Sequence, residues 1–213
     1  REQLSELASR GNVTNLVTGL IAEASAPEIP NTEVTGVRVK PLVKQLPYSS
    51  LWGRNLASIL FKQIGRADTV HIHFARDLIP ISGAVIAKLL RRKLILQTHG
   101  MILKDGRIST QIIDFLFTRP LLRSADKVLV LSHIELRDLR AISEKPNFKI
   151  LGNGIGHRAS VEQKPWADRP KIVDFCSRLH KRKRIDIFID IATLALDRKS
   201  TRLNSSHTDI SRM

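Results

Sequence analysis

The stretch ADKVLVLSHIELRDL, residues 125–139, indicates the fold class more clearly than any other part of the chain. Its first half contains the aliphatic run VLVL, residues 128–131, which is apolar on both faces of an expected strand. Its second half has the spacing of an amphipathic helix. A strand of this kind that leads directly into a helix is typical of a parallel sheet covered by helices on both sides.

Ser132 and Glu135 lie where the two halves of this stretch meet, in the pattern S-x-x-E. In such a capping box the serine accepts a hydrogen bond from a free N–H group of the first helical turn, and the glutamate reaches back toward the preceding backbone. We expect both residues to have a structural role first, because together they define where the helix begins.

Short apolar runs and amphipathic segments alternate along most of the chain. The pattern predicts strands at residues 13–17, 34–39, 69–73, 94–97, 127–131 and 148–151, and helices at residues 51–64, 78–90, 110–122 and 134–142. The expected architecture is therefore α/β, with a doubly wound parallel sheet.

The composition changes after residue 151, where glycine, asparagine and proline become frequent. We predict a first domain at residues 1–151, a linker at 152–170, and the first strand and helix of a second domain within 171–196. The single cysteine, Cys176, falls in the expected strand 172–176, where we expect a small buried hydrophobe rather than a nucleophile. One cysteine excludes an intramolecular disulfide framework, and a cytoplasmic setting fits.

Residues 197–213 read DRKSTRLNSSHTDISRM and have neither helical nor strand periodicity. Residues 197–207 resemble a translated sequencing adapter, so we expect a tail that is not native and exclude it from the fold. The chain begins with Arg1 and shows no charged-then-apolar signal segment, which we interpret as truncation.

The formal net charge of +15 favours partners that carry phosphate, such as nucleic acid, anionic lipid or a nucleotide. Aromatic residues make up only 5% of the chain, which argues against a binder of single-stranded nucleic acid, because such proteins stack bases on aromatic rings. The longest apolar segment, residues 78–90, is interrupted by Ser82, Gly83 and Lys88, so we expect a core helix there.

Ligands of doubly wound folds bind at the carboxyl ends of the strands. His71 and His73 end one expected strand, and His99 with Gly100 follows the next. A histidine there can exchange a hydrogen bond or a proton with a sugar hydroxyl or a leaving oxygen. The alternative is a structural histidine whose ring hydrogen-bonds only to the nearby backbone. Strand alternation places His71 and His73 on one face, where we expect at least one to serve packing.

The loop after the expected strand 172–176 is strongly basic. It carries Arg178, Lys181, Arg182 and Lys183 just before a helix. Arginine offers a fork of donors, lysine a point charge and the helix start its free N–H groups, a combination that suits a diphosphate. The alternative is a solvated surface loop.

Taken in order, these motifs resemble family 4 of the GT-B glycosyltransferases. The matching stretches are ADTVHIHF at residues 67–74, LILQTHG at 94–100, ADKVLVLSHIELRDL at 125–139, FKILGNGI at 148–155 and DFCSRLHKRKRIDIFI at 174–189. The resemblance implies a Rossmann-like acceptor-binding domain followed by the start of a second, donor-binding Rossmann-like domain. It also implies a retaining transfer from a nucleotide-sugar to a glycan or lipid-linked acceptor, with no bound metal and no cofactor besides the donor.

The resemblance also implies roles for individual residues. The R-x4-K pattern of the family, which contacts the donor diphosphate, corresponds to Arg178 and Lys183. The histidine that lies near the transferred sugar corresponds to His99, the catalytic candidate. Gly154 and His73 are expected to contact substrate.

Several features of the family pattern differ here. Its glycines before the arginine and after the lysine are replaced by Ser177 and Arg184, so the loop is expected to approach phosphate less closely. The glycine-rich turn after the first strand is expected before Arg1, and the paired glutamates E-x7-E beyond Leu196. We therefore expect a fragment that is inactive alone.

Two alternatives stay open. A nucleotide-sugar epimerase uses the same fold, and carboxylates and histidines suited to acid-base chemistry in its second half would distinguish it. A basic module that binds nucleic acid or an anionic membrane predicts charge on one helix face or a strong salt dependence. Here Arg91, Arg92 and Lys93 cluster at a helix end, where the alternative is that they only complement the helix dipole. A lipid-linked acceptor would reconcile an enzyme with a basic surface, so we expect peripheral contact with the inner face of a membrane and no nucleic-acid partner.

Overall fold

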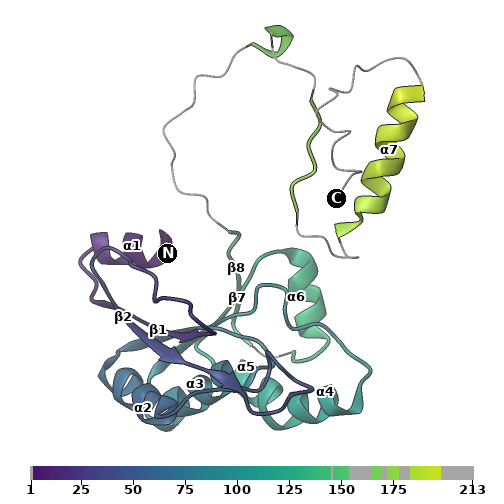
Figure 1. Ribbon diagram of the computed structural model, residues 1–213. Coiled ribbons are helices and arrows are strands. Elements are labelled where there is room, and N and C mark those ends of the chain that lie inside the picture. Colours follow the sequence, from purple (N-terminus) through teal and green to yellow (C-terminus); the bar gives the residue numbers. More distant parts are fainter. Residues whose placement is uncertain (1, 145, 154–164, 169–171, 178–182, 198–213) are drawn as a thin grey trace. The chain divides into compact units, whose positions relative to one another are not determined.

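The computed structural model describes residues 2–144, 146–153, 165–168, 172–177 and 183–197 (Figure 1). The chain divides into two compact units, residues 1–156 and 157–213. The first unit contains the sheets and nearly all of the helices that the structure describes.

The first unit is built around a four-stranded parallel sheet with the order β5-β6-β7-β8. Its strands are β5 (Thr69–His73), β6 (Lys93–Gln97), β7 (Lys127–Val130) and β8 (Phe148–Ile150). Each lies within one residue of its predicted bounds, and the parallel α/β fold is confirmed. Consecutive strands are neighbours in space, so all four carboxyl ends lie along one edge of the sheet.

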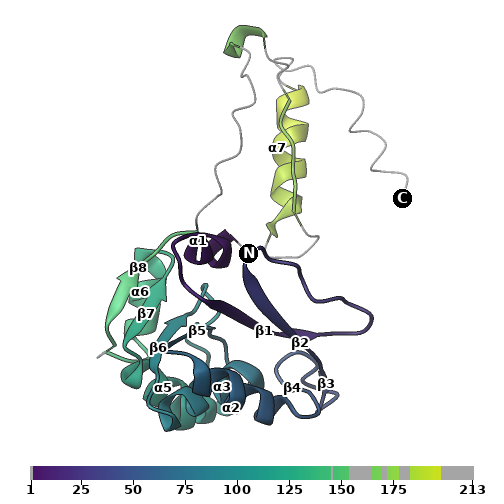
Figure 2. The ribbon, with the colours of Figure 1, turned by 90° about the vertical axis from the view of Figure 1, so that its left-hand side faces the viewer.

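A smaller parallel sheet pairs β1 (Thr14–Leu20) with β2 (Thr32–Arg38), and α1 (Glu2–Ser9) packs against it. Figure 2 shows β1 and β2 to one side of β5 to β8, with helices α2 (Leu56–Arg66) and α3 (Leu78–Leu89) beside them. Both sheets contribute to one apolar core, in which Val37 lies together with Leu94 and Leu96.

The helix predicted at residues 51–64 begins later, at Leu56. Residues 51 and 52 instead form β4 (Leu51–Trp52), which pairs with β3 (Lys40–Pro41) in antiparallel orientation. At Gly53 the backbone approaches so closely that a Cβ atom would stand 2.5 Å from the Arg38 carbonyl oxygen. The chain turns into a helix only after the close contact at Gly53. The apolar spacing alone therefore predicted a helix that begins too early.

The helix predicted at residues 110–122 is a continuous helical segment with a wide turn in its middle. It consists of α4 (Ile108–Ile113), the π-helical η1 (Asp114–Thr118) and α5 (Arg119–Ser124). Pro120 explains the wide turn, because in a regular α-helix its ring would clash with the carbonyl four residues earlier. The segment is followed by β7, and α6 (His133–Arg140) connects β7 to β8.

In the second unit the structure describes α7 (Ile185–Asp197) and the short 3-10 helix η2 (Trp166–Asp168). The strand expected at residues 172–176 is not formed, because a strand needs a neighbour to pair with and none of the described segments supplies one. Cys176 is exposed, so its expected burial is wrong for the same reason. Of the expected tail, residues 198–213 lie outside the described residues.

Candidate active site

Three histidines form a row at the carboxyl edge of the main sheet. His71 and His73 project from the same face of β5, as strand alternation predicted, and their ring centroids lie 5.4 Å apart. His99, just beyond β6, continues the row with a nearly parallel ring 4.7 Å from that of His73. The His73 Nδ1 and His99 Nε2 atoms are 2.6 Å apart, which is a hydrogen bond.

The register of β5 and β6 produces this contact. His73 is paired with Gln97, so His99 comes two residues beyond the pairing partner of His73 and reaches the end of the neighbouring strand. Gln97 is buried, and its Oε1 atom lies 3.1 Å from the Nε2 atom of His71. An amide oxygen can only accept, so His71 donates from Nε2 and its Nδ1 atom is an acceptor.

The first two histidines of the row favour the neutral form. The pKa of His71 lies below its ordinary value of 6.5, chiefly because burial penalises the charged ring, and the Gln97 contact offsets this only partly. The pKa of His73 is also lowered, first by burial and then by the neighbouring rings of His71 and His99. Near pH 7 this edge of the sheet therefore offers uncharged imidazoles that can both donate and accept hydrogen bonds.

The loop that presents His99 has an unusual backbone. His99 has φ of 48° and Gly100 has φ of 69°, both in the left-handed region. Glycine adopts this region freely, whereas a histidine there costs free energy and must be held by its surroundings.

Glu135 is the residue that holds this loop. Its side chain is buried and accepts hydrogen bonds from the Thr98 hydroxyl, from the Gly100 N–H at 2.5 Å and from the Leu131 N–H at 2.6 Å. Three donors directed at one buried side chain suit a carboxylate, which offers only acceptors. Glu135 thereby ties the loop after β6 to the end of β7.

The capping box is thus only partly what the sequence predicted. Ser132 caps α6 by accepting the Glu135 N–H at 3.3 Å, as expected. The Glu135 carboxylate bonds to the backbone of Leu131 and to the histidine loop, and it supports the site as well as the helix start. The S-x-x-E spacing was the available signal, but it pointed only to a local role.

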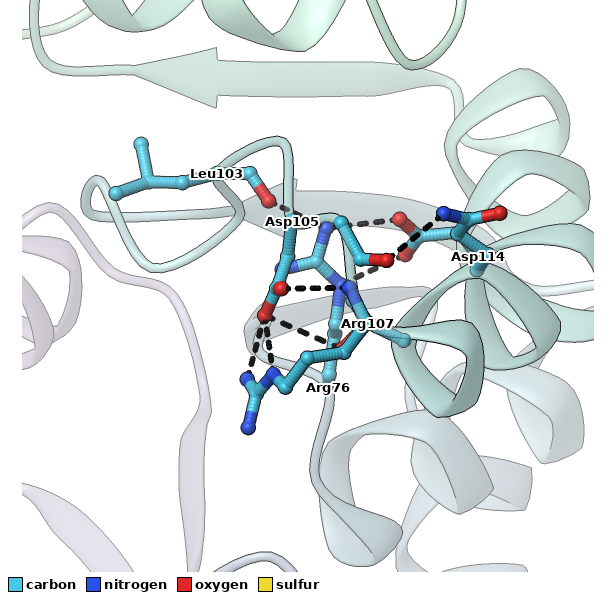
Figure 3. A network of polar contacts seen from close by, with 8 residues as sticks. Arg76, Leu103, Asp105, Arg107 and Asp114 are labelled. Atoms are coloured by element: carbon cyan, nitrogen blue, oxygen red, sulfur yellow. Dashed lines mark hydrogen bonds and ion pairs between the residues drawn. The ribbon is translucent and has the colours of Figure 1, made fainter.

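A buried ion pair fixes the other end of the loop after β6 (Figure 3). Arg76, which follows β5, donates from Nε and Nη2 to the two carboxylate oxygens of Asp114 at 2.7 and 2.9 Å. The same Nη2 donates to the Leu103 carbonyl at 2.8 Å. Figure 3 shows the Arg76 guanidinium reaching across to Asp114 on η1, with Leu103 on the loop beside it. Sequence analysis assigned no role to Arg76 or Asp114.

The loop also has its own internal ties. Asp105 accepts hydrogen bonds from the Arg107 backbone N–H and side chain at 3.0 and 2.7 Å, and from the Thr110 hydroxyl at 3.3 Å. The Arg107 guanidinium lowers the pKa of Asp105 to about 2. Residues 98–110 are therefore held at three points, by Glu135, Arg76 and Asp105.

The glycosyl transferase 4-like domain family model matches residues 1–154, which covers the whole main sheet and the histidine row. The chain belongs to this family. A comparison with curated proteins gave no match. The protein is a family 4 glycosyltransferase of the GT-B type, and its substrates are a sugar donor and an acceptor.

Two of the residues expected to form the site of this glycosyltransferase lie in contact. The structure joins His73 and His99, whereas Arg178 and Gly154 lie outside the described residues. Lys183 is described and exposed, and it belongs to the second unit. Among the described residues, no group of three or more His, Cys, Asp or Glu side chains is arranged to hold a metal ion.

The backbone of Arg184 adopts a conformation that favours glycine, the residue that the family resemblance predicts at this position. Its φ is 51°, in the region that glycine adopts without strain. The guanidinium donates to the Asp186 carboxylate at 2.8 to 3.1 Å, on the first turn of α7. The loop retains the conformation of a glycine here although it carries an arginine.

The lowered histidine pKa values predict a pH dependence of stability. The unfolded chain binds protons at its histidines from about pH 6.5 downward, whereas folded His71 and His73 resist protonation, so folding becomes less favourable as the pH falls below that value. We expect the thermal unfolding midpoint to fall between about pH 7 and pH 5. The double variant H71Q/H73Q should show a shallower fall, measured by circular dichroism. The matched control H133Q removes an exposed histidine from α6, and an equal flattening there would contradict the assignment.

Proposed function

We propose that this glycosyltransferase moves a sugar from a nucleotide-sugar to a glycan or lipid-linked acceptor and retains the anomeric configuration. The observation that carries the proposal is the hydrogen-bonded pair of His73 and His99 at the carboxyl edge of the sheet. Parallel α/β folds bind ligands at this edge. The family match favours this reaction class over the epimerase and the nucleic-acid or membrane-binding module.

In the proposed site His99 is the catalytic residue that faces the transferred sugar. The His73 contact orients the His99 ring and occupies its Nε2 atom, which leaves Nδ1 for the substrate. A neutral imidazole can accept a proton from a sugar hydroxyl, or it can orient that hydroxyl through a hydrogen bond. Glu135 and the left-handed backbone supply the rigid support that such positioning needs.

The donor half of the proposal rests on the basic loop. Arg178 and Lys183 would stabilise the negative charge that grows on the departing nucleoside diphosphate, and Gly154 would let the backbone approach the substrate. No metal and no further cofactor enters this mechanism. We place the enzyme in the cytoplasm, with peripheral contact at the inner face of a membrane.

The diphosphate assignment is tested in the product of the complete gene. We expect R178A and K183A each to lower kcat for transfer or donor hydrolysis by about 100-fold or more, the effect of removing a donor to transition-state charge. K127A, which removes an exposed cation from the first unit, is the control and should retain normal turnover. Near-normal turnover in both R178A and K183A would show that the basic loop does not bind the diphosphate.

A further inference from the structure

The helical segment of residues 108–124 exposes several large apolar side chains in its first half and buries polar ones there, although Leu121 and Leu122 in its second half pack into the core. Ile108 is 76% exposed, Ile112 51%, Phe115 70% and Leu116 54%. Thr110, Asp114 and Thr118 on the opposite side are buried. A surface helix ordinarily directs its apolar face inward, so this arrangement needs a cause.

Two polar contacts hold the helix in this orientation. Asp114 must face inward because both of its carboxylate oxygens bond to Arg76. Thr110 is held on the same side by the carboxylate of Asp105. Turning the helix to bury its aliphatic residues would break the ion pair and leave the Arg76 guanidinium unpaired. The outward direction of the apolar residues is therefore built into the fold.

The exposed residues form one continuous surface, which we call the apolar face. It consists of Ile108, Ile112, Phe115 and Leu116, spaced four, three and one residues apart on a helix. The loop that Arg76 ties to this helix also exposes two apolar side chains, Met101 and Leu103. Contiguous apolar patches of this kind are uncommon on monomeric proteins and mark sites of interaction.

Exposed cations flank the apolar face at both ends. Lys104 and Arg107 precede it, and Arg119 and Arg123 follow it. Asp105 pairs with Arg107 and Asp114 is buried against Arg76, so Lys104, Arg119 and Arg123 supply the outward positive charge. The surface is thus apolar in its centre and positively charged at its ends.

We propose that the apolar face docks on an anionic membrane surface, with Ile112 and Phe115 entering the boundary between headgroups and acyl chains. The cations complement anionic headgroups, and this pairing distinguishes a membrane from an uncharged protein partner. None of the helices that the structure describes is both long and apolar enough to cross a bilayer.

The proposed docking rests on the proposed function in one respect. A transferase that modifies a lipid-linked acceptor needs its acceptor site near the membrane surface. Residues 98–110 run from His99 to the start of the docking helix, and their ties to Glu135 and Arg76 make this connection rigid. Docking of the helix would therefore hold the histidine pair at a set height above the lipid headgroups.

The test measures vesicle binding, which needs no enzyme activity. The 213-residue chain is mixed at low salt with vesicles of phosphatidylcholine and phosphatidylglycerol, and the bound fraction is found by flotation. We expect I112S/F115S to weaken binding by about tenfold or more, because two large apolar side chains no longer leave water. R119Q/R123Q should weaken it by roughly fivefold for each cation and reduce the preference over pure phosphatidylcholine vesicles.

Matched controls remove exposed apolar residues elsewhere. L42S/L46S changes another surface of the first unit and I187S/I191S changes α7, and both should bind vesicles as the unmodified chain does. Undiminished binding by I112S/F115S would overturn the proposal. So would a chain that ignores anionic vesicles but forms a dimer, seen by analytical ultracentrifugation, that I112S/F115S abolishes.

A separate assay distinguishes this proposal from the proposed function. In the product of the complete gene, I112S/F115S should transfer sugar to a water-soluble acceptor at an unchanged rate. If vesicle binding behaves as expected but no glycosyl transfer is found with any nucleotide-sugar, the docking surface stands and the reaction does not. If glycosyl transfer is normal and I112S/F115S binds vesicles as well as the unmodified chain, the proposed reaction stands and the docking surface does not.

Discussion

Asp114→Ala is expected to lower the free energy of unfolding by about 3 to 5 kcal/mol, as loss of one partner from a buried ion pair does. Only 15% of the Arg76 side chain and 9% of the Asp114 side chain are exposed. Without the carboxylate, the guanidinium would keep one hydrogen bond, to the Leu103 carbonyl. Its positive charge would stay buried with no anionic partner. Equilibrium unfolding in urea measures the change.

Two further variants make this result specific. D105A removes a carboxylate that bonds to the exposed Arg107 and to Thr110, and we expect it to cost only about 1 kcal/mol, because the Arg107 guanidinium stays in water. R76L/D114L replaces both charges with apolar groups and should recover much of the loss, because no buried charge is left unpaired. If D114A were no more destabilising than D105A, the ion pair would not hold the helical segment of residues 108–124 in place.

His99→Asn is expected to lower kcat of the complete gene product by about 100-fold or more while stability changes by less than about 1 kcal/mol. Asparagine adopts the left-handed conformation more readily than most residues, so the backbone at this position is preserved. Its amide is not an acid or base near pH 7, so proton transfer is lost. Transfer kinetics and urea unfolding of the same variant separate the chemical effect from the structural one.

Two controls accompany the His99 variant. H133N makes the same chemical change at an exposed histidine on α6 and should leave kcat unaltered. H73Q tests the positioning contact: an amide can still bond to His99, so H73Q should retain more activity than H73F, which cannot. Turnover by H99N within a few-fold of the unmodified enzyme would show that His99 does not act on the substrate.

The contrast between β5 and residues 172–176 shows where prediction from the sequence succeeds. Alternation over residues 69–73 predicted a strand with the same bounds as the structure, and β6 and β7 were placed within one residue. Residues 172–176 have an equally good apolar pattern, yet they lie in no strand, and Cys176 is exposed. The pattern reports the preference of a segment, whereas a strand also requires a partner.

The candidate site could likewise be predicted from the sequence only in part. Strand ends and the resemblance to family 4 predicted His99 and His73 as site residues, because ligands gather at the carboxyl edge of parallel sheets. The contact between the two rings joins residues 26 positions apart and depends on the pairing of β5 with β6. No local signal states that register, so the hydrogen bond could not be predicted from either strand alone.

The stretch at residues 125–139 determined the fold class by itself, because helical and strand periodicity arise from backbone geometry within a few residues. Tertiary structure alone decided what Glu135 holds and which way the helical segment of residues 108–124 faces. The polar side of this segment faces inward because Asp114 pairs with Arg76, which is 38 positions away in the sequence. Pairing the buried charge outweighs burying the aliphatic residues, and this pairing exists only once the distant segments have come together.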